Sequence, residues 1–89
     1  MNVTVLFFGK FRELTARRDQ LVPLKEGAQL ADLIEYLSRE YGTAFRSELS
    51  NTDQLHILVN GQYHNILDDM KTKLKNGDVI ALMPLASGG

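Results

Sequence analysis

The chain has 89 residues, with 10 Lys and Arg residues against 11 Asp and Glu residues and a formal net charge of -1. This length suits one domain and leaves too small a core for a large enclosed active site, and the scattered charge gives no indication of nucleic-acid binding. The sequence contains no cysteine, which excludes disulfides, thiolate metal sites and cysteine nucleophiles.

The first predicted element is a strand over residues 2–8, where apolar residues occupy every second position. Gly9 ends this strand, and residues 11–16 are expected to form a short helical turn. Residues 19–24 predict a second strand, in which Pro23 indicates a sheet edge or a strand end. Because the connection is short, the two strands are expected to form a hairpin.

An amphipathic helix is predicted over residues 29–41, followed by Gly42 at the position where helices commonly end. No Ser, Thr, Asp or Asn immediately precedes it, so the sequence offers only a weak N-cap. The apolar side chains recur at helical spacing and mark the face that should pack on a sheet. They are Leu30, Leu33, Ile34, Leu37 and Tyr41.

Residues 43–53 are polar and irregular and predict a loop with at most one turn. Residues 54–59 then predict a strand, and Asn60-Gly61 is the strongest short hairpin signal in the chain. A short returning strand is expected over residues 62–65.

Residues 66–74 are mixed in character and could include a turn of helix. Asn76-Gly77 predicts a second turn before a final strand over residues 78–85. That last strand is almost entirely apolar, which is typical of a central strand.

The order of hairpin, helix, strand, short strand and final strand predicts an α+β fold of the ubiquitin-like β-grasp type. We expect a mixed sheet of four to five strands packed on one main helix, formed by residues 1–85, with residues 86–89 as a flexible tail. The predicted core lies between sheet and helix and comprises Val3, Val5, Phe7, Leu30, Leu33, Ile34, Leu37, Ile57, Val59, Ile80 and Leu82.

Few residues could carry chemistry. There is no nucleotide-binding glycine motif and no zinc-binding helix motif, so we expect no bound cofactor and no metal site. His56 and His64 have no Asp, Glu or His at ligand spacing and are expected on a sheet surface. Asp68-Asp69 is interpreted as a solvated loop, and Ser87 has no nearby base to activate it.

The C-terminal Gly88-Gly89 is the strongest functional signal. Two terminal glycines arise by chance in roughly one chain in 200. Glycine has no Cβ, so it can pass a narrow channel and adopt backbone angles closed to other residues. This tail is therefore suited to threading its carboxylate into the nucleotide site of a partner enzyme, where adenylation would convert a poor electrophile into a reactive one.

A docking face is predicted at the root of that tail. If the odd-numbered residues of the first strand face the helix, Phe8 points to the opposite face of the sheet. The same alternation sends His56, Leu58, Ala81 and Met83 outward. The predicted partner-binding residues are Phe8, Leu58, Tyr63, Met83, Pro84, Leu85, Ala86 and Ser87.

Residues 5–14 resemble the opening of the small subunit of molybdopterin synthase, the MoaD family, in which a hydrophobic strand leads into Phe-Phe-Ala and Arg-Glu-Leu. Residues 32–42 are similar to the helix of that family, and residues 59–61 and 74–81 to its closing hairpin and last strand. Gly88-Gly89 matches its terminus. One departure lies before the tail, where the family has Phe-Pro-Pro and this chain has Met83-Pro84-Leu85.

The resemblance implies a sulfur carrier that is not an enzyme by itself. The absence of cysteine and of a signal-peptide pattern favours a cytoplasmic location. The carboxylate of Gly89, presented by Gly88, would be adenylated with ATP by an E1-like adenylyltransferase of the MoeB type and thiocarboxylated by a sulfur donor enzyme. Sulfur would then pass to a pterin precursor in the large subunit of molybdopterin synthase, of the MoaE type, in a heterotetramer. No nucleic acid and no membrane would be involved.

Other functions share the same fold and tail. A sulfur carrier for thiamine, cysteine or tRNA thiolation is one alternative, and a ubiquitin-like protein modifier is another. An inert structural module ranks behind both. The sequence leaves open which acceptor receives the sulfur and whether the metal is molybdenum or tungsten.

Overall fold

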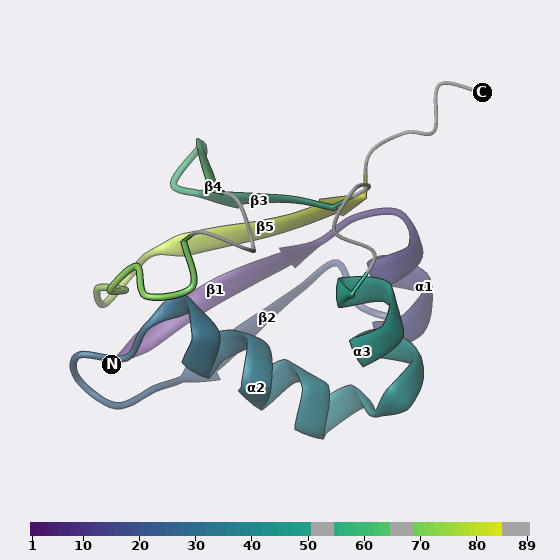
Figure 1. Cartoon of the computed structure of the whole chain (residues 1–89), viewed down its shortest axis with the longest axis horizontal. Helices are drawn as coiled ribbons and strands as arrows, with labels where there is room; N and C mark the ends of the chain where they lie inside the picture. Colours follow the sequence, from purple (N-terminus) through teal and green to yellow (C-terminus); the bar gives the residue numbers. More distant parts are fainter. Residues whose placement is uncertain (51–54, 65–68, 85–89) are drawn as a thin grey trace.

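The computed structural model describes residues 1–50, 55–64 and 69–84. A five-stranded sheet, in the order β2-β1-β5-β3-β4, packs on helices that cover one of its faces (Figure 1). The predicted mixed α+β architecture of the ubiquitin-like type is confirmed. The elements are β1 (Asn2–Phe7), α1 (Lys10–Thr15), β2 (Asp19–Pro23), α2 (Leu30–Tyr41), α3 (Thr43–Leu49), β3 (Leu55–Val59), β4 (Gln62–His64) and β5 (Val79–Pro84).

The N-terminal hairpin forms as predicted. β1 and β2 pair antiparallel, with Val3 opposite Val22 and Val5 opposite Gln20. β2 is an edge strand, and Pro23 is its last residue, a position where the missing N–H of proline disturbs no ladder. The alternation of apolar residues buries Val3 and Val5 on the helix side of the sheet.

The last strand occupies the centre of the sheet. β5 pairs parallel with β1 and antiparallel with β3, so its neighbours come from opposite ends of the chain. Ile80 and Leu82 are fully buried between the sheet and the helices. The apolar run therefore indicated the central strand correctly.

The hairpin of β3 and β4 turns at Asn60-Gly61. Both residues have positive φ, 51° for Asn60 and 83° for Gly61, which the tight turns of two-residue hairpins require. The Asn60 side chain also ties this turn to β5, since its Oδ1 accepts a 2.9 Å hydrogen bond from the N–H of Val79.

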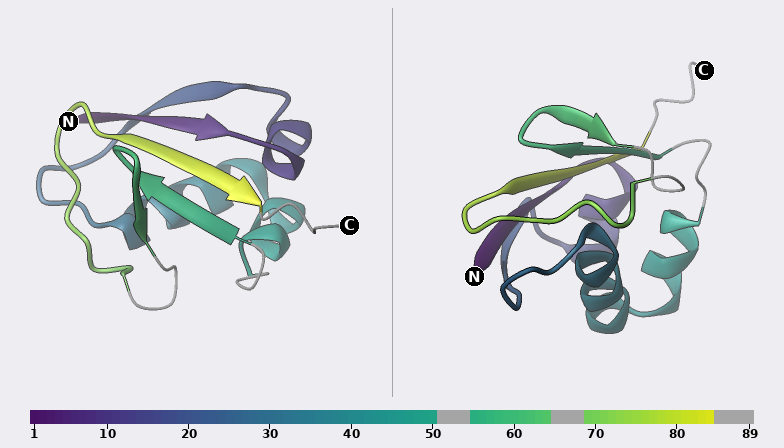
Figure 2. Two further views of the ribbon diagram at one scale, coloured as in Figure 1. Left: turned by 90° about the horizontal axis from the view of Figure 1, so that it is seen from above. Right: turned by 60° about the vertical axis from the view of Figure 1, so that its left-hand side comes forward.

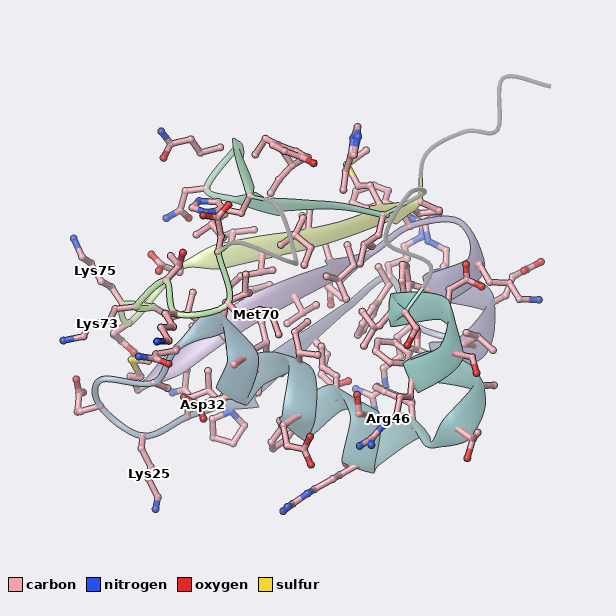
Figure 3. The ribbon with its side chains drawn as sticks, viewed as in Figure 1. Lys25, Asp32, Arg46, Met70, Lys73 and Lys75 are labelled. Carbon is pink, nitrogen blue, oxygen red and sulfur yellow. The ribbon has the colours of Figure 1, made fainter. Side chains whose placement is uncertain are left out.

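The N-terminus of the main helix, α2, is better capped than the sequence predicted. The Asp32 carboxylate accepts a 2.7 Å hydrogen bond from the backbone N–H of Gln29, the residue that caps α2. This is half of a capping box, and it lies near the labelled Asp32 in Figure 3. The signal that could have revealed it is the acidic residue three positions after the cap.

The core matches the predicted list with one correction. Ile34 is half-buried, while Leu33 is fully buried, because the described residues cover the Leu33 side of the helix completely and the Ile34 side only in part. The core also includes apolar residues that the periodicity did not select. These are Phe11, Val22, Ala28, Phe45, Leu49, Leu55, Leu74 and Ala81.

The prediction of a loop over residues 43–53 was wrong for its first part. Residues Thr43–Leu49 form α3, which buries Phe45 and Leu49 at helical spacing. The Phe45 ring lies 5.2 Å from that of Phe11 and 6.1 Å from that of Phe7, measured between centroids, in edge-to-face geometry. Aromatic pairs at such distances stabilise a core beyond their buried area.

The remaining expectations concern chain ends and short segments. Residues 51–54, 65–68 and 85–89, including the tail predicted over 86–89, lie outside the described residues. The helices that the structure describes include none with the length and hydropathy needed to cross a membrane.

Candidate functional site: an uncovered sheet face at the root of the tail

The predicted reactive end follows directly from β5. This strand ends at Pro84, so Pro84 is the described residue closest in sequence to Gly88-Gly89. The predicted site residues Leu85, Ala86 and Ser87 lie, like the two glycines, outside the described residues. The candidate site is therefore built from the sheet surface around the end of β5.

One face of the sheet carries no helix in the described part of the chain. Figure 2 shows this face toward the viewer in its left view, with the helices behind the sheet. The strand register forms a first row across it: Leu58 of β3 lies opposite Tyr63 of β4 and Ala81 of β5, and Ala81 lies opposite Leu6 of β1.

A second row lies next to the tail root. His56 of β3 pairs with Met83 of β5. Phe8, just past β1, donates its N–H to the carbonyl of Leu82 at 3.2 Å, and the pleat turns its side chain to the same face as Met83. The two rows bring the predicted residues Phe8, Leu58, Tyr63 and Met83 together on one surface, hereafter the docking face.

The exposure of these side chains is graded. Tyr63 is 53% exposed, whereas Phe8, Leu58 and Met83 are half-buried. Ala81, expected to point outward, is buried at 8%. Its register places it on the outer face, but its methyl group is short and lies between the larger side chains of Leu6 and Leu58.

Two polar side chains belong to the docking face. The guanidinium of Arg12 lies 5.6 Å from the centroid of the Phe8 ring, and its Nε donates a 3.2 Å hydrogen bond to the Phe7 carbonyl. The His56 ring meets the Tyr63 ring edge-to-face at 5.0 Å between centroids. Sequence alternation indicated the position of His56, but it gave no sign of Arg12, which reaches this surface from α1.

The apolar surface extends across the sheet beyond the predicted patch. The large hydrophobic side chains that the described residues expose are Leu21, Tyr63 and Val79. Leu21 and Val79 both lie opposite Thr4 of β1, on the outer face. The outer face of the sheet therefore exposes apolar side chains on three strands, and exposed apolar patches mark interaction sites in soluble proteins.

The charged side chains of the 71–75 segment lie elsewhere. Lys73 and Lys75 lie at the end of the molecule opposite the C-terminal end of β5 (Figure 3). The other histidine, His64, has its Nδ1 3.9 Å from Asp69 Oδ2. Among the described residues, no group of three or more His, Cys, Asp or Glu side chains could hold a metal ion.

A polar pair stabilises the helix side of the sheet. The Tyr41 hydroxyl donates a hydrogen bond to Oε1 of the buried Gln20. Burial raises the pKa of the Tyr41 hydroxyl above its ordinary value, an effect partly offset by the charge of Arg17. Since Gln20 belongs to the inner face of β2, this pair connects α2 to the sheet and does not belong to the docking face.

Comparison with known families gives a match over almost the whole chain. The model of the ThiS family matches residues 5–89. A molybdopterin synthase sulfur carrier subunit of Drosophila erecta is 38% identical over 91 residues, covering all of this chain and 92% of that protein. Small archaeal modifier protein 3 of Haloferax volcanii is 29% identical over 92 residues, across the full length of both chains.

Solved structures with the same fold point in the same direction. A putative molybdopterin converting factor, subunit 1, from Pyrococcus furiosus superposes with a TM-score of 0.81 at 31% identity, over 96% of this chain and 98% of that chain. A chain in the complex of subunits 1 and 2 of molybdopterin-converting factor from Helicobacter pylori superposes with a TM-score of 0.65 at 26% identity, over the whole of both chains.

Proposed function

The chain belongs to the ThiS family, and we propose that it is a sulfur carrier that acts as the small subunit of molybdopterin synthase. The observation that carries this proposal is an apolar sheet face, which no helix covers among the described residues, at the root of a chain ending in Gly88-Gly89. Such an arrangement can dock on a partner while it extends a carboxylate into the active site of that partner. The protein supplies a reactive group and is not a catalyst by itself.

The chemistry takes place at the carboxylate of Gly89. An attack of this carboxylate on the α-phosphorus of ATP would give an acyl-adenylate and release pyrophosphate. Hydrosulfide-level sulfur would then displace AMP and leave a thiocarboxylate, with one sulfur in place of one oxygen. The thiocarboxylate sulfur would then attack a carbon of a pterin precursor and displace an oxygen leaving group from it. Hydrolysis of the resulting acyl–sulfur bond would leave the sulfur on the pterin and regenerate the carboxylate for another cycle.

The proposed cycle needs three partners. Because the chain lacks the motifs that bind ATP, an E1-like adenylyltransferase of the MoeB type would perform the activation. A sulfur donor enzyme would supply the sulfur. A large subunit of the MoaE type would hold the acceptor in a heterotetramer, a proposal supported by the two-subunit complex from Helicobacter pylori. The cycle would run in the cytoplasm.

Intact-mass analysis tests this function directly. The purified protein is incubated with the cognate adenylyltransferase, ATP and sulfide, and the expected product is heavier by the difference between sulfur and oxygen. Adding the large subunit and a pterin precursor should return the mass to its starting value. A product that keeps its original mass with active cognate partners would overturn the proposal.

Charge placed on the docking face should weaken partner binding without unfolding the protein. In Phe8→Glu or Met83→Glu, a carboxylate must be desolvated at the centre of an apolar contact. We expect losses on the order of 2 kcal/mol or more in the free energy of binding to both the adenylyltransferase and the large subunit. Titration calorimetry measures the affinities, and circular dichroism measures the melting temperature.

The matched control for these variants is Ala44→Glu. Ala44 is an exposed residue of α3, on the helix side of the molecule, so this substitution adds the same charge away from the docking face. Its affinities should equal those of the wild type. Unchanged affinity in both Phe8→Glu and Met83→Glu would show that partners use another surface.

A second candidate function is that of a ubiquitin-like modifier, favoured by the full-length similarity to small archaeal modifier protein 3. Both functions begin with the same acyl-adenylate and differ in the nucleophile that follows. A lysine amine would give an isopeptide bond to a target protein, whereas sulfide gives the thiocarboxylate. Mass spectrometry of tryptic peptides from cells separates them, since trypsin makes its last cut in this chain after Lys75 and conjugation would leave residues 76–89 on target lysines. A carrier for thiamine, cysteine or tRNA thiolation would form the thiocarboxylate but would not complete the pterin reaction.

A further inference from the structure

β2 lies at the edge of the described sheet, and part of its backbone is unpaired there. The Phe7 N–H donates a 2.8 Å hydrogen bond to the Arg18 carbonyl, just before β2. Just after β2, the Leu24 N–H donates one of 2.8 Å to the Met1 carbonyl. Because alternate residues of an antiparallel strand bond the same neighbour, the even-numbered residues of β2 bond β1. Leu21 therefore directs its N–H and its C=O away from the sheet.

The rest of this edge is protected against uncontrolled pairing. Pro23 falls in the same outward register as Leu21 but has no N–H to offer. Asp19, on the other side of Leu21, places a charge on the edge. A partner can therefore extend the sheet only over a short stretch centred on Leu21, whose side chain is 63% exposed.

A groove lies between this edge and α2. One open hollow of about 480 Å³ is lined by Leu24 and by the solvent side of α2, and a second of about 430 Å³ continues it along the loop after β2. Both include Leu24 and Asp32, which Figure 3 labels. Leu24 and Tyr36 are half-buried against the core and supply the apolar part of the lining. We call the two hollows together the β2–α2 groove.

The lining of the β2–α2 groove is predominantly acidic. It contains four carboxylates against two cationic side chains: Glu26, Asp32, Glu35, Glu40, Lys25 and Arg39. Glu35 is neutralised, since it lies 3.0 Å from Arg39 and 3.7 Å from Arg46. Glu26 and Glu40 form no ion pair with the part of the chain that the structure describes. The groove therefore complements a cationic ligand.

We propose that the β2–α2 groove binds an extended, basic segment of a partner protein, which adds to the sheet at Leu21. Side chains of such a segment alternate between the two faces of the sheet. Those on the helix side are lysine or arginine, whose apolar stem covers Tyr36 while the charge reaches the carboxylates. Those on the outer face lie beside the Leu21 side chain and are apolar. Arg17 and Arg18 lie at the opposite end of β2, so the basic residues belong at the end next to Leu24.

A second copy of this chain does not fit the same pattern. The helix-side residues of its own β2 are Gln20 and Val22, which are uncharged and buried in their own core. They cannot enter the groove of another molecule. The inference is also independent of the proposed function, because neither the docking face nor Gly89 takes part in it.

The experiment titrates the full chain at low ionic strength with a short capped peptide of alternating arginine and valine. We expect saturable binding of this peptide and none of the same peptide with glutamate in place of arginine. Glu26→Lys and Glu40→Lys should each weaken binding by about fivefold or more, because an attractive charge pair becomes a repulsive one. Asp32 is left unchanged, since it caps α2.

Two control variants separate this groove from general charge attraction and from the docking face. Glu13→Lys makes the same charge change at an exposed residue of α1, outside the groove. Phe8→Glu alters the docking face only. Both should bind the arginine peptide without loss.

Amide hydrogen exchange tests the addition of a strand directly. The Leu21 N–H should exchange more slowly at saturating peptide, whereas the Val22 N–H, already bonded to β1, should show no such gain. No binding of the arginine peptide, equal losses in Glu13→Lys and Glu40→Lys, loss of binding in Phe8→Glu, or unchanged exchange at Leu21 would each overturn the proposal. A protein that binds the peptide but is not adenylated would instead overturn the proposed function.

Discussion

Deletion of Gly89 should abolish adenylation and thiocarboxylation while the melting temperature stays that of the full-length protein. The reaction occurs at the terminal carboxylate, and the deletion moves that carboxylate one residue, about 3.3–3.6 Å, back from the site of attack on ATP. Misplacement by a single ångström can already cost about a hundredfold. No residue of the described core is touched.

Two further variants sharpen this test. Adding one alanine after Gly89 displaces the carboxylate in the other direction and should be equally inactive. The Ala44→Glu protein, changed only at an exposed position of α3, keeps the chain length and both glycines and should react like the wild type. Pyrophosphate release reports adenylation, and intact mass reports the thiocarboxylate. Full activity of the Gly89 deletion would show that the terminal diglycine is not the reactive end.

Truncation of Leu33 on α2 should produce a large loss of stability. Leu33 is fully buried against the sheet, and replacing it with alanine removes apolar contacts and leaves a cavity. The expected cost is about 2–5 kcal/mol in the free energy of unfolding. A domain of this kind has a total of about 5–15 kcal/mol, so the variant should be close to unfolding at physiological temperature.

Ile34→Ala is the matched control, since it removes a similar number of atoms from the adjacent, half-buried position. Its cost should be less than half of that of Leu33→Ala. Urea denaturation followed by circular dichroism measures both values. A larger loss for Ile34→Ala than for Leu33→Ala would mean that the helix presents a different face to the sheet.

The elements that the sequence predicted correctly are those with a strong local pattern. Apolar spacing over twelve residues marked α2, alternation marked β1, and Asn60-Gly61 marked the hairpin. α3 was not predicted because it has only seven residues, too few for a helical period to emerge, and its burial depends on Phe45 meeting Phe7 and Phe11. Such contacts arise from the tertiary fold and leave no local signature.

The candidate site likewise combines positions that the sequence predicted and contacts that it could not predict. The outward positions of Phe8, Leu58 and Met83 follow from counting along a strand, which needs only the period of two. The approach of Arg12 to Phe8 requires the direction of α1. The apolar surface over Leu21 and Val79 joins residues far apart in the chain, so it could be recognised only once the register of β1 with its two neighbours was known.

The central position of β5 has a consequence for how the protein folds during its synthesis on the ribosome. Thr4 pairs with Val79, so the sheet closes through contacts between nearly the first and nearly the last residues of the chain. Pairings of such long sequence separation form late in folding. A nascent chain that has not yet released β5 lacks the middle of its sheet and the surface that a partner would recognise. The sheet and its outer face are therefore completed only when the segment next to the C-terminus has been synthesised.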